Sequence, residues 1–252
     1  MKHLDLFSGI GGFALAASWV WGAEHEVVSF VEIDDYCQRV LKKNWPDVVV
    51  CADIRNHRHD GSDIDLITGG FPCQDISFAK TWDSDGENKE NGIDGKRSGL
   101  WKYLCNTIGT VRPRFAIVEN SAAIAVRGLD RVLYDLAQIG YDAEWQTIPC
   151  SVFGAPHRRE RIFIVAYPNS VRRVQERLFQ GRVFSEAIRK APEWKSCRAI
   201  RCLGGKASLP DWFGVDDGIP KEPYENDAIT ALGNSIAPQV VVPIMRAIKV
   251  EQ

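Results

Sequence analysis

The sequence lacks any apolar run long enough to cross a membrane, and its first residues lack the basic-then-apolar pattern of a secretory signal. Its seven cysteines are odd in number and form no Cys-x-x-Cys pair, which argues against a disulfide framework and against a zinc site. We therefore expect reduced thiols, a cytoplasmic location, no membrane partner and no bound metal.

A strong charge of one sign is also absent. The chain has 31 Lys and Arg against 33 Asp and Glu, a formal net charge of −2, which excludes a uniformly basic coat for nucleic acid. Residues 168–206, however, contain ten Lys or Arg and three Glu, a local charge of +7 that leaves −9 for the rest of the chain. A basic segment on an acidic body is typical of phosphate contact, although a solvated helix face looks similar.

Apolar periodicity indicates the fold class. Over the first two thirds of the chain, short apolar runs alternate with helical patterns, as in βαβ units with a parallel sheet. The predicted strands are residues 4–7, 26–31, 48–50, 64–68, 115–119, 144–149 and 161–166. The predicted helices are residues 12–21, 35–44, 100–111, 130–139 and 238–250. We expect an α/β protein with a Rossmann-like sheet covered by helices on both faces.

The same pattern divides the chain into parts. Residues 1–167 are predicted to form the main domain, and residues 168–227 a small basic domain where the sheet pattern stops. Residues 228–252 are expected to pack back onto the main domain, against its first strands. The polar stretch 80–96 has no apolar periodicity and predicts a loop of the kind that often closes over an active site.

A glycine-rich turn follows the first predicted strand, where the run from Asp5 to Phe13 reads Asp-Leu-Phe-Ser-Gly-Ile-Gly-Gly-Phe. Such a turn lets the backbone approach a ligand at a helix amino terminus. Glu32 and Asp53 close the next two strands, where acids can bind ribose hydroxyls and an adenine amino group. Plain turn glycines are the alternative. Position 14 is Ala14, so the third glycine of the dinucleotide fingerprint is missing, which favours S-adenosylmethionine over NAD.

A cysteine stands directly after the apolar run 64–67, in the stretch Gly69-Gly70-Phe71-Pro72-Cys73-Gln74. The glycines and the proline are expected to stop the strand and turn the backbone outward. A thiol at the carboxyl end of a parallel strand lies where open α/β sheets bind ligands. This stretch alone leaves two interpretations equally open, a free cysteine in a turn and a nucleophile.

Five motifs follow one another along the chain. They are Asp5-x-Phe7-x-Gly9-x-Gly11-Gly12, Gly70-Phe71-Pro72-Cys73-Gln74, Glu119-Asn120-Ser121, His157-Arg158-Arg159-Glu160-Arg161 and Gly233-Asn234-Ser235. Taken together, they resemble the ordered motifs of the cytosine-C5 DNA methyltransferases of prokaryotic and phage type. The resemblance covers residues 4–167 and 228–250, and five motifs in family order make it specific. The family usually has glutamine where this chain has His157.

The resemblance implies a covalent reaction. Carbon 5 of cytosine is a poor nucleophile, and addition of the Cys73 thiolate to carbon 6 converts the ring into an enamine that accepts a methyl group. Glu119 is implied to bond ring nitrogen 3 and the amino group, although a strand-end acid can also simply cap a turn. Arg159 and Arg161 alternate along a predicted strand start, so both can face one pocket; a solvated basic turn is the alternative.

The resemblance also implies where S-adenosylmethionine and DNA bind. The reacting carbon lies inside a duplex, so the target base must be extruded. The basic segment corresponds in position to the family's target-recognition domain. The residues implied at the cofactor are Phe7, Gly9, Ile10, Gly11, Gly12, Glu32, Ile33, Asp53, Ile54, Pro72, Asn234 and Ser235. Those expected at DNA are Gln74, Ser77, Lys96 and Arg97, of which the two basic residues can equally be solubilising charges.

The sequence therefore predicts an enzyme that transfers a methyl group from S-adenosylmethionine to carbon 5 of a flipped cytosine in double-stranded DNA. A tRNA cytosine methyltransferase, a binding-only relative and an ordinary dehydrogenase are the competing hypotheses. The missing third glycine and the position of Cys73 disfavour the dehydrogenase. We expect a monomer, and a cognate restriction endonuclease stays open as a companion.

Overall fold

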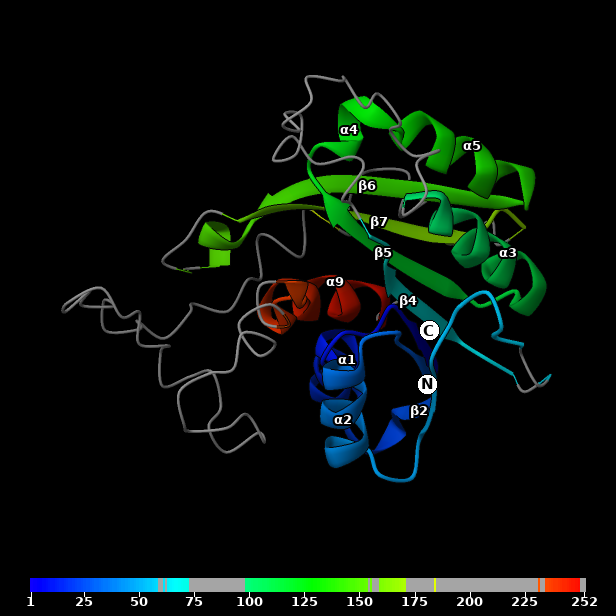
Figure 1. Ribbon diagram of the computed structural model, residues 1–252. Coiled ribbons are helices and arrows are strands. Elements are labelled where there is room, and N and C mark those ends of the chain that lie inside the picture. Colours follow the sequence, from blue (N-terminus) through cyan, green and yellow to red (C-terminus); the bar gives the residue numbers. More distant parts are fainter. Residues whose placement is uncertain are drawn as a thin grey trace, which may run out of the picture.

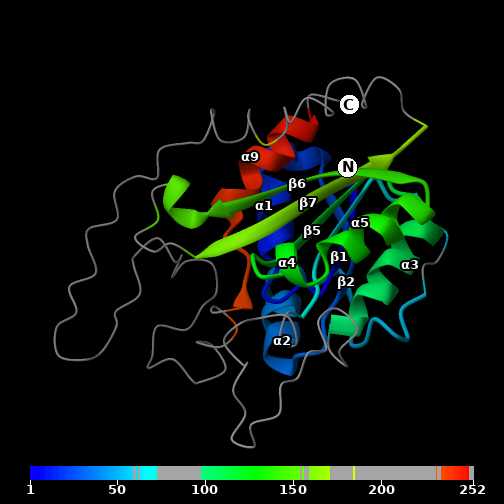
Figure 2. The same ribbon diagram turned by 90° about the horizontal axis from the view of Figure 1, so that it is seen from above.

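A computed structural model describes residues 1–58, 63–72, 98–153, 159–170 and 234–249, together with residues 61, 155, 184 and 231. Seven of its strands form one sheet in the order β3-β2-β1-β4-β5-β7-β6 (Figures 1 and 2). The strands are β1 (Lys2–Leu6), β2 (Glu26–Val31), β3 (Val49–Cys51), β4 (Leu66–Gly70), β5 (Phe115–Ser121), β6 (Tyr141–Pro149) and β7 (Glu160–Pro168).

Strands β1 to β5 are parallel to one another, whereas β7 runs antiparallel between β5 and β6. The chain passes from β1 outward to β2 and β3 and then returns to place β4 on the other side of β1. The loops after β1 and β4 therefore leave the sheet side by side, at the reversal point where open α/β sheets bind ligands.

Helices cover both faces of the sheet, which confirms the predicted fold class (Figure 1). One face carries α1 and α9, whose apolar residues form one buried cluster with side chains of β5 and β7. The other face carries α3 and α5, which pack in a second cluster with β1, β4 and β5. The helices are α1 (Gly12–Trp21), α2 (Asp35–Asn44), α3 (Trp101–Val111), α4 (Ile124–Arg127), α5 (Leu129–Gln138) and α9 (Pro238–Lys249), with short 3₁₀ turns η1 (Gly22–Glu24), η4 (Ser98–Leu100) and η5 (Cys150–Phe153).

Helix α9 packs against α1, and the two helices lie side by side in Figures 1 and 2. Eight of its residues are buried, including Val241, Ile244 and Ile248. Each such side chain contributes about 1.5–3 kcal/mol by leaving water. The Lys249 ammonium fastens the far end of the helix by donating to the Val20 carbonyl at 3.0 Å.

Strand β4 also differs from the prediction, because Gly69 and Gly70 continue it instead of ending it. Both glycines pair with β5, opposite Val118 and Glu119. A Cβ atom on Gly69 would lie 2.7 Å from the Leu104 side chain, and one on Gly70 would lie 2.9 Å from the Glu119 carboxylate. These positions are glycine because neighbouring side chains need the space, which a pattern of turn residues does not reveal.

Two further strand boundaries differ from the prediction, and one short helix was not predicted. Strand β6 begins at Tyr141, three residues earlier than predicted, because its pairing with β7 continues to Pro168. Phe7 was expected inside the first strand, but its φ of 54° lies in the left-handed region and ends β1. Helix α4 was not predicted, since four residues carry too little periodicity to detect.

A chain of buried polar groups crosses the sheet beneath the glycine loop. The Thr68 hydroxyl donates to an Asp5 carboxylate oxygen at 2.6 Å and lies 2.7 Å from His3 Nε2, while His3 Nδ1 lies 3.0 Å from His25 Nε2. Burial and the nearby His25 hold the pKa of His3 well below its usual value. Burial also raises the pKa of Asp5. With both histidines neutral, each member can donate to the next, from His25 through to Asp5.

Replacing Thr68 by valine is expected to lower the free energy of unfolding by about 1–3 kcal/mol, because it leaves His3 and Asp5 buried without their shared partner. Urea denaturation of the wild type and Thr68→Val measures this loss. Thr68→Ser keeps the hydroxyl and is the matched control, expected to lose less. A valine variant as stable as the wild type would contradict the role given to the hydroxyl.

Glu144 on β6 is a half-buried acid whose carboxylate oxygens are enclosed. Within the described part of the chain, both of its carboxylate oxygens are buried and accept no hydrogen bond. Burial alone raises the pKa of Glu144 to about 7. Because the folded state holds this proton more tightly than the unfolded state does, the stability it contributes is present below about pH 4.5 and is lost as the pH rises to about 7.

Glu144→Gln is therefore expected to raise the free energy of unfolding at pH 8 by about 1–2 kcal/mol. The rise in the pKa of Glu144 corresponds to about 3 kcal/mol, of which solvent around this partly exposed residue screens a share. At pH 4 the variant and the wild type should differ little, because the wild-type carboxyl is then neutral. Chemical denaturation of both proteins at the two pH values tests this. If the free energy of unfolding changed with pH in the same way in the wild type and in Glu144→Gln, ionisation of Glu144 would not destabilise the folded state, and the prediction would be wrong.

Candidate active site

The loop between β1 and α1 brings the first group of predicted residues to the carboxyl edge of the sheet. Gly9 and Gly11 have φ angles of 55° and 87°, in the region that favours glycine. A Cβ atom on Gly11 would lie 2.7 Å from the Trp45 ring, and one on Gly12 would lie 2.9 Å from the Ile236 carbonyl oxygen. The loop is therefore held tightly between α2 on one side and the segment before α9 on the other.

Glu32, directly after β2, faces this loop. Its carboxylate accepts hydrogen bonds from the Gly9 N–H at 2.7 Å and from the Asp34 N–H at 2.8 Å. Burial raises the pKa of Glu32, and these hydrogen bonds oppose the rise. The Gly9 N–H that a pyrophosphate would need is thus already occupied by an anion. Ile33, whose side chain is 67% exposed, stands beside Glu32 and offers an apolar surface for a flat ring.

Two predicted residues, Asp53 and Ile54, follow β3 and have different surroundings. The Asp53 carboxylate accepts hydrogen bonds from Arg55 Nε, at 3.0 and 2.9 Å, and from Arg55 Nη2 at 2.6 Å, and these bonds lower the pKa of Asp53. In this structure its carboxylate is thus paired with a neighbour in the chain. Ile54 is buried and belongs to the cluster formed with α3 and α5.

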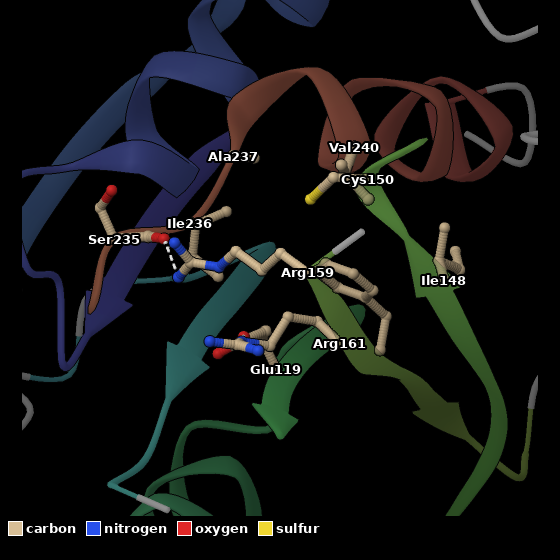
Figure 3. Close-up of a pocket in the computed structure, with 10 residues that line it drawn as sticks. Glu119, Ile148, Cys150, Arg159, Arg161, Ser235, Ile236, Ala237 and Val240 are labelled. Carbon is tan, nitrogen blue, oxygen red and sulfur yellow. Dashed lines mark hydrogen bonds and ion pairs between the residues drawn. The ribbon is translucent and has the colours of Figure 1, made fainter. Parts of the chain in front are cut away.

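A second group of predicted residues meets in a pocket between β5, β7 and the segment before α9 (Figure 3). The Arg161 Nε atom lies 2.9 Å from a Glu119 carboxylate oxygen. Arg159 donates to the Ser235 carbonyl at 2.6 Å, the bond drawn as a dashed line in Figure 3. Both arginines therefore face one pocket, as their alternation along the strand start predicts. Cys150, from the turn after β6, also lines it.

The Glu119 side chain is only 12% exposed. Burial raises its pKa, and the positive charges of Arg161 and Arg159 oppose this rise. One carboxylate oxygen is held by Arg161, and the carboxyl group lies against Gly70 at the end of β4. Pro72 follows two residues later, so a buried, oriented carboxyl group stands beside the strand end that leads to Cys73.

Asn120 is a positioning residue that the sequence reasoning missed. It is buried, its amide donates to the Phe71 carbonyl at 3.0 Å, and its side-chain oxygen accepts from the Ser121 N–H at 2.8 Å. Asn120 thereby ties the end of β5 to the loop that leaves β4. The sequence contained a signal for this role, because Asn120 directly follows Glu119 within the motif Glu119-Asn120-Ser121.

Some of the predicted site residues lie outside the part of the chain that the structure describes. Cys73, together with the residues expected at DNA and the motif position His157, lies outside the described residues. Among the described ones, Asn234 is exposed, whereas Phe7, Ile10 and Pro72 are half-buried at the carboxyl edge of the sheet. The residues expected at DNA that lie outside are Gln74, Ser77, Lys96 and Arg97. The described part of the chain holds no helix long and apolar enough to span a membrane, and no cluster of side chains suited to a metal ion.

Comparison with known proteins identifies the family. Residues 1–196 match the family model described as C-5 cytosine-specific DNA methylase. The chain belongs to this family. The predicted resemblance is therefore confirmed, and the matched residues include the glycine loop, Glu119 and both arginines of the pocket.

Relatives of this family member include bacterial and viral proteins. The chain is 34% identical over 174 residues to the Type II methyltransferase M2.BsuMI of Bacillus subtilis, and 32% identical over 168 residues to M.CviJI of Paramecium bursaria Chlorella virus IL3A. Each match covers 66% of this chain and 42% of the relative, so the chain spans less than half the length of these relatives.

Among solved structures, the S. pombe Dnmt2 methyltransferase matches this family member with a TM-score of 0.53 at 20% identity. The match covers 67% of this chain and 50% of that protein. At this level of identity the likeness shows a shared fold. That fold is the mixed sheet whose carboxyl edge carries the glycine loop and the pocket.

Proposed function

We propose that the protein transfers a methyl group from S-adenosylmethionine to carbon 5 of cytosine in double-stranded DNA. The observation that carries this proposal is the buried Glu119 carboxyl group, held by Arg161 beside the strand end that leads to Cys73. An acid at the end of one strand and a cysteine that follows the end of the neighbouring strand by three residues in the sequence suit a reaction that begins by adding a nucleophile to a pyrimidine. Membership of the cytosine-specific family and the Type II methyltransferase names of its relatives support DNA as the substrate.

The proposed reaction begins at the cytosine ring. The Cys73 thiolate forms a bond to carbon 6, and the electron pair of the 5,6 double bond moves toward carbon 5. Carbon 5 then attacks the methyl group of S-adenosylmethionine, the bond between that methyl group and sulfur breaks, and S-adenosylhomocysteine leaves with the electron pair. Glu119, whose pKa burial raises, donates a proton to ring nitrogen 3 as electron density accumulates there. A base then removes the proton on carbon 5, the thiolate leaves from carbon 6 to restore the double bond, and ring nitrogen 3 returns its proton to Glu119.

The glycine loop and its neighbours fit the methyl donor. S-adenosylmethionine supplies an electrophilic methyl group on a sulfonium centre. Glu32 is placed to accept the ribose hydroxyls, and the exposed Ile33 to cover the adenine ring. No phosphate has to be accommodated, which agrees with the carboxylate already bonded to Gly9. Pro72 and Ser235 approach from the two segments that flank the loop.

The target base must leave the duplex to reach this pocket. We propose that the loop of residues 77–100 closes over the flipped nucleotide, and that Gln74, Ser77, Lys96 and Arg97 contact DNA. Residues 168–227 are proposed to form the small target-recognition domain, because ten of the chain's cations gather between residues 168 and 206. Positive side chains there would neutralise DNA phosphates and make binding weaken with salt.

Transfer of label from S-adenosylmethionine tests the proposal. The protein is incubated with labelled cofactor and unmethylated duplex DNA, and in parallel with tRNA. We expect label in DNA, recovered as 5-methylcytosine after hydrolysis, and none in tRNA. Label in tRNA alone would overturn the DNA assignment, and label in neither would overturn the proposed activity.

A further inference from the structure

Two buried aromatic rings pack against each other beside the end of β4. Phe71 directly follows the strand, and Trp101 is the first residue of α3. Their ring centroids are 5.5 Å apart and their planes are tilted by 46°. Both rings belong to the buried cluster that α3 forms with α5. Within the described part of the chain, the residues that line the pocket around Glu119 do not include either ring.

Phe71 holds the backbone at the end of β4. Its carbonyl accepts the Asn120 amide at 3.0 Å, which ties the strand end to the residue after Glu119. Gly70, directly before Phe71, pairs with Glu119 across the two strands. Cys73 follows Phe71 by two residues in the sequence. The position of Phe71 therefore acts both on the proposed acid and on the backbone that leads to the proposed nucleophile.

Trp101 is held in turn by an acid of α5. Its indole Nε1–H donates to an Asp135 carboxylate oxygen at 2.9 Å. The same carboxylate accepts the Arg131 Nε–H at 2.9 and 3.0 Å, in an ion pair between residues one helical turn apart. Helices α3 and α5 lie side by side in Figures 1 and 2, which brings Asp135 to the start of α3. Asp135 is half-buried, so its carboxylate can bind both partners.

The bond to Asp135 selects one orientation of the Trp101 ring. An indole has a single N–H donor, and a buried one needs an acceptor, so rotation of the ring away from Asp135 is unfavourable. In this orientation the indole forms the surface against which the Phe71 ring packs. Because interiors are close-packed, a change in the tilt of one ring displaces the other.

We propose that Asp135 is a positioning residue for methyl transfer, which orients Trp101 and thereby fixes Phe71. The strand end that Phe71 holds carries the contact to Glu119 and leads to Cys73. Asp135 acts only through these residues and stands on a helix that contributes no other residue to the site. This inference rests on the proposed function and adds to it a residue that the motifs do not contain.

The test compares two substitutions that differ in one acceptor. Asp135→Ala removes the acceptor of the indole, whereas Asp135→Asn keeps a side-chain oxygen for it, and both remove the charge beside Arg131. Methyl transfer is followed in a single turnover, with enzyme in excess over duplex DNA that carries the sequence found methylated in cells expressing the protein. The rate is expressed per site that binds S-adenosylhomocysteine, counted by calorimetry, so that unfolded protein does not lower it.

We expect Asp135→Ala to lower the transfer rate by about 10-fold, because a small misplacement caused far from the chemistry can cost up to about 10²-fold. Asp135→Asn should stay within about twofold of the wild-type rate. The affinity for S-adenosylhomocysteine should change by less than about twofold in both variants, since the loss falls on the chemical step rather than on binding.

Tyr141→Phe controls for stability. Tyr141 belongs to the same buried cluster as Trp101, and its hydroxyl donates to the Pro113 carbonyl at 2.6 Å. The substitution removes one buried hydrogen bond and keeps the ring, as loss of the indole bond does. It should lower the melting temperature and leave the transfer rate per site at the wild-type value.

Trp101→Phe removes the other partner of the same hydrogen bond while keeping a ring against Phe71. It should also slow transfer, and adding Asp135→Ala to it should slow transfer by less than about twofold further, because both substitutions break one bond. If Asp135→Ala does not fold, Trp101→Phe carries the comparison of transfer rate with cofactor affinity.

The outcomes are distinct. A lower melting temperature in Asp135→Ala with the wild-type rate per site would show a merely structural role and overturn the inference. Equal losses of rate in Asp135→Ala and Asp135→Asn would also overturn it, because the indole acceptor would not be their cause. Both results leave the proposed function intact. A wild type that transfers no methyl group to DNA would overturn the proposed function and the inference with it.

Discussion

Cys73→Ala is expected to lower methyl transfer to cytosine by about 10⁴-fold or more, the scale on which removing a covalent nucleophile acts. Without the thiolate, carbon 5 keeps the poor nucleophilicity of an aromatic ring, and the oriented Glu119 has no adduct to stabilise. Transfer of tritium from labelled S-adenosylmethionine to duplex DNA measures the loss. Cofactor affinity should change little, because Cys73 is proposed to contact the base.

Cys105→Ala is the matched control for this prediction. Cys105 is a free, buried thiol in α3, and burial raises its pKa to about 11, so it stays protonated and unreactive at neutral pH. This variant should keep its activity. DNA containing 5-fluorocytosine adds a direct probe, since fluorine at carbon 5 cannot leave as a cation and the adduct cannot resolve. The wild type should form a complex that survives denaturing gels, and Cys73→Ala none; full transfer by Cys73→Ala would refute the covalent mechanism.

Glu119→Gln is expected to lower kcat by about 10²–10⁴-fold, the usual contribution of a positioned general acid. The amide keeps the size of the side chain and can still contact Arg161, but it cannot deliver a proton to ring nitrogen 3. Because a neutral carboxyl is the active form, wild-type activity should fall as the pH rises through the raised pKa of Glu119. This falling limb should be missing in the variant.

The control for the Glu119 prediction is a substitution of Arg161, the residue that holds the Glu119 carboxyl group. Arg161→Lys keeps a positive charge near the carboxyl group but loses the fixed geometry of the guanidinium, so it should reduce kcat less than Glu119→Gln does. Steady-state rates between pH 5.5 and 9 compare the proteins. A Glu119→Gln variant with the wild-type kcat and pH profile would show that the acid serves only to hold the strand end.

Sequence reasoning placed the acid and the two arginines correctly because it depended on strand ends. Parallel strands β4 and β5 bring Gly70 opposite Glu119, so two motifs more than forty residues apart meet at one edge. The alternation of Arg159 and Arg161 likewise put both side chains in one pocket. Such geometry follows from the period of a strand and needs no tertiary detail.

The structural features that the sequence did not predict depend mostly on packing between distant segments. The glycines at the end of β4 were predicted to stop the strand, yet they continue it, since Leu104 and Glu119 need the space. The close approach of Gly12 and Ile236 brings together residues from opposite ends of the chain, and no local sequence pattern predicts it. The ion pair between Asp53 and Arg55 is local. The sequence did not predict it, because an acid at a strand end can bind either a ligand or a neighbouring cation.

Bisulfite sequencing of DNA from cells that express the protein tests the central claim most directly. Methylated cytosines resist deamination, so the proposed function predicts protected cytosines within one recurring sequence in these cells and none in cells expressing Cys73→Ala. Complete conversion of every cytosine, in cells where the wild-type protein is folded and abundant, would contradict the claim that this chain methylates DNA.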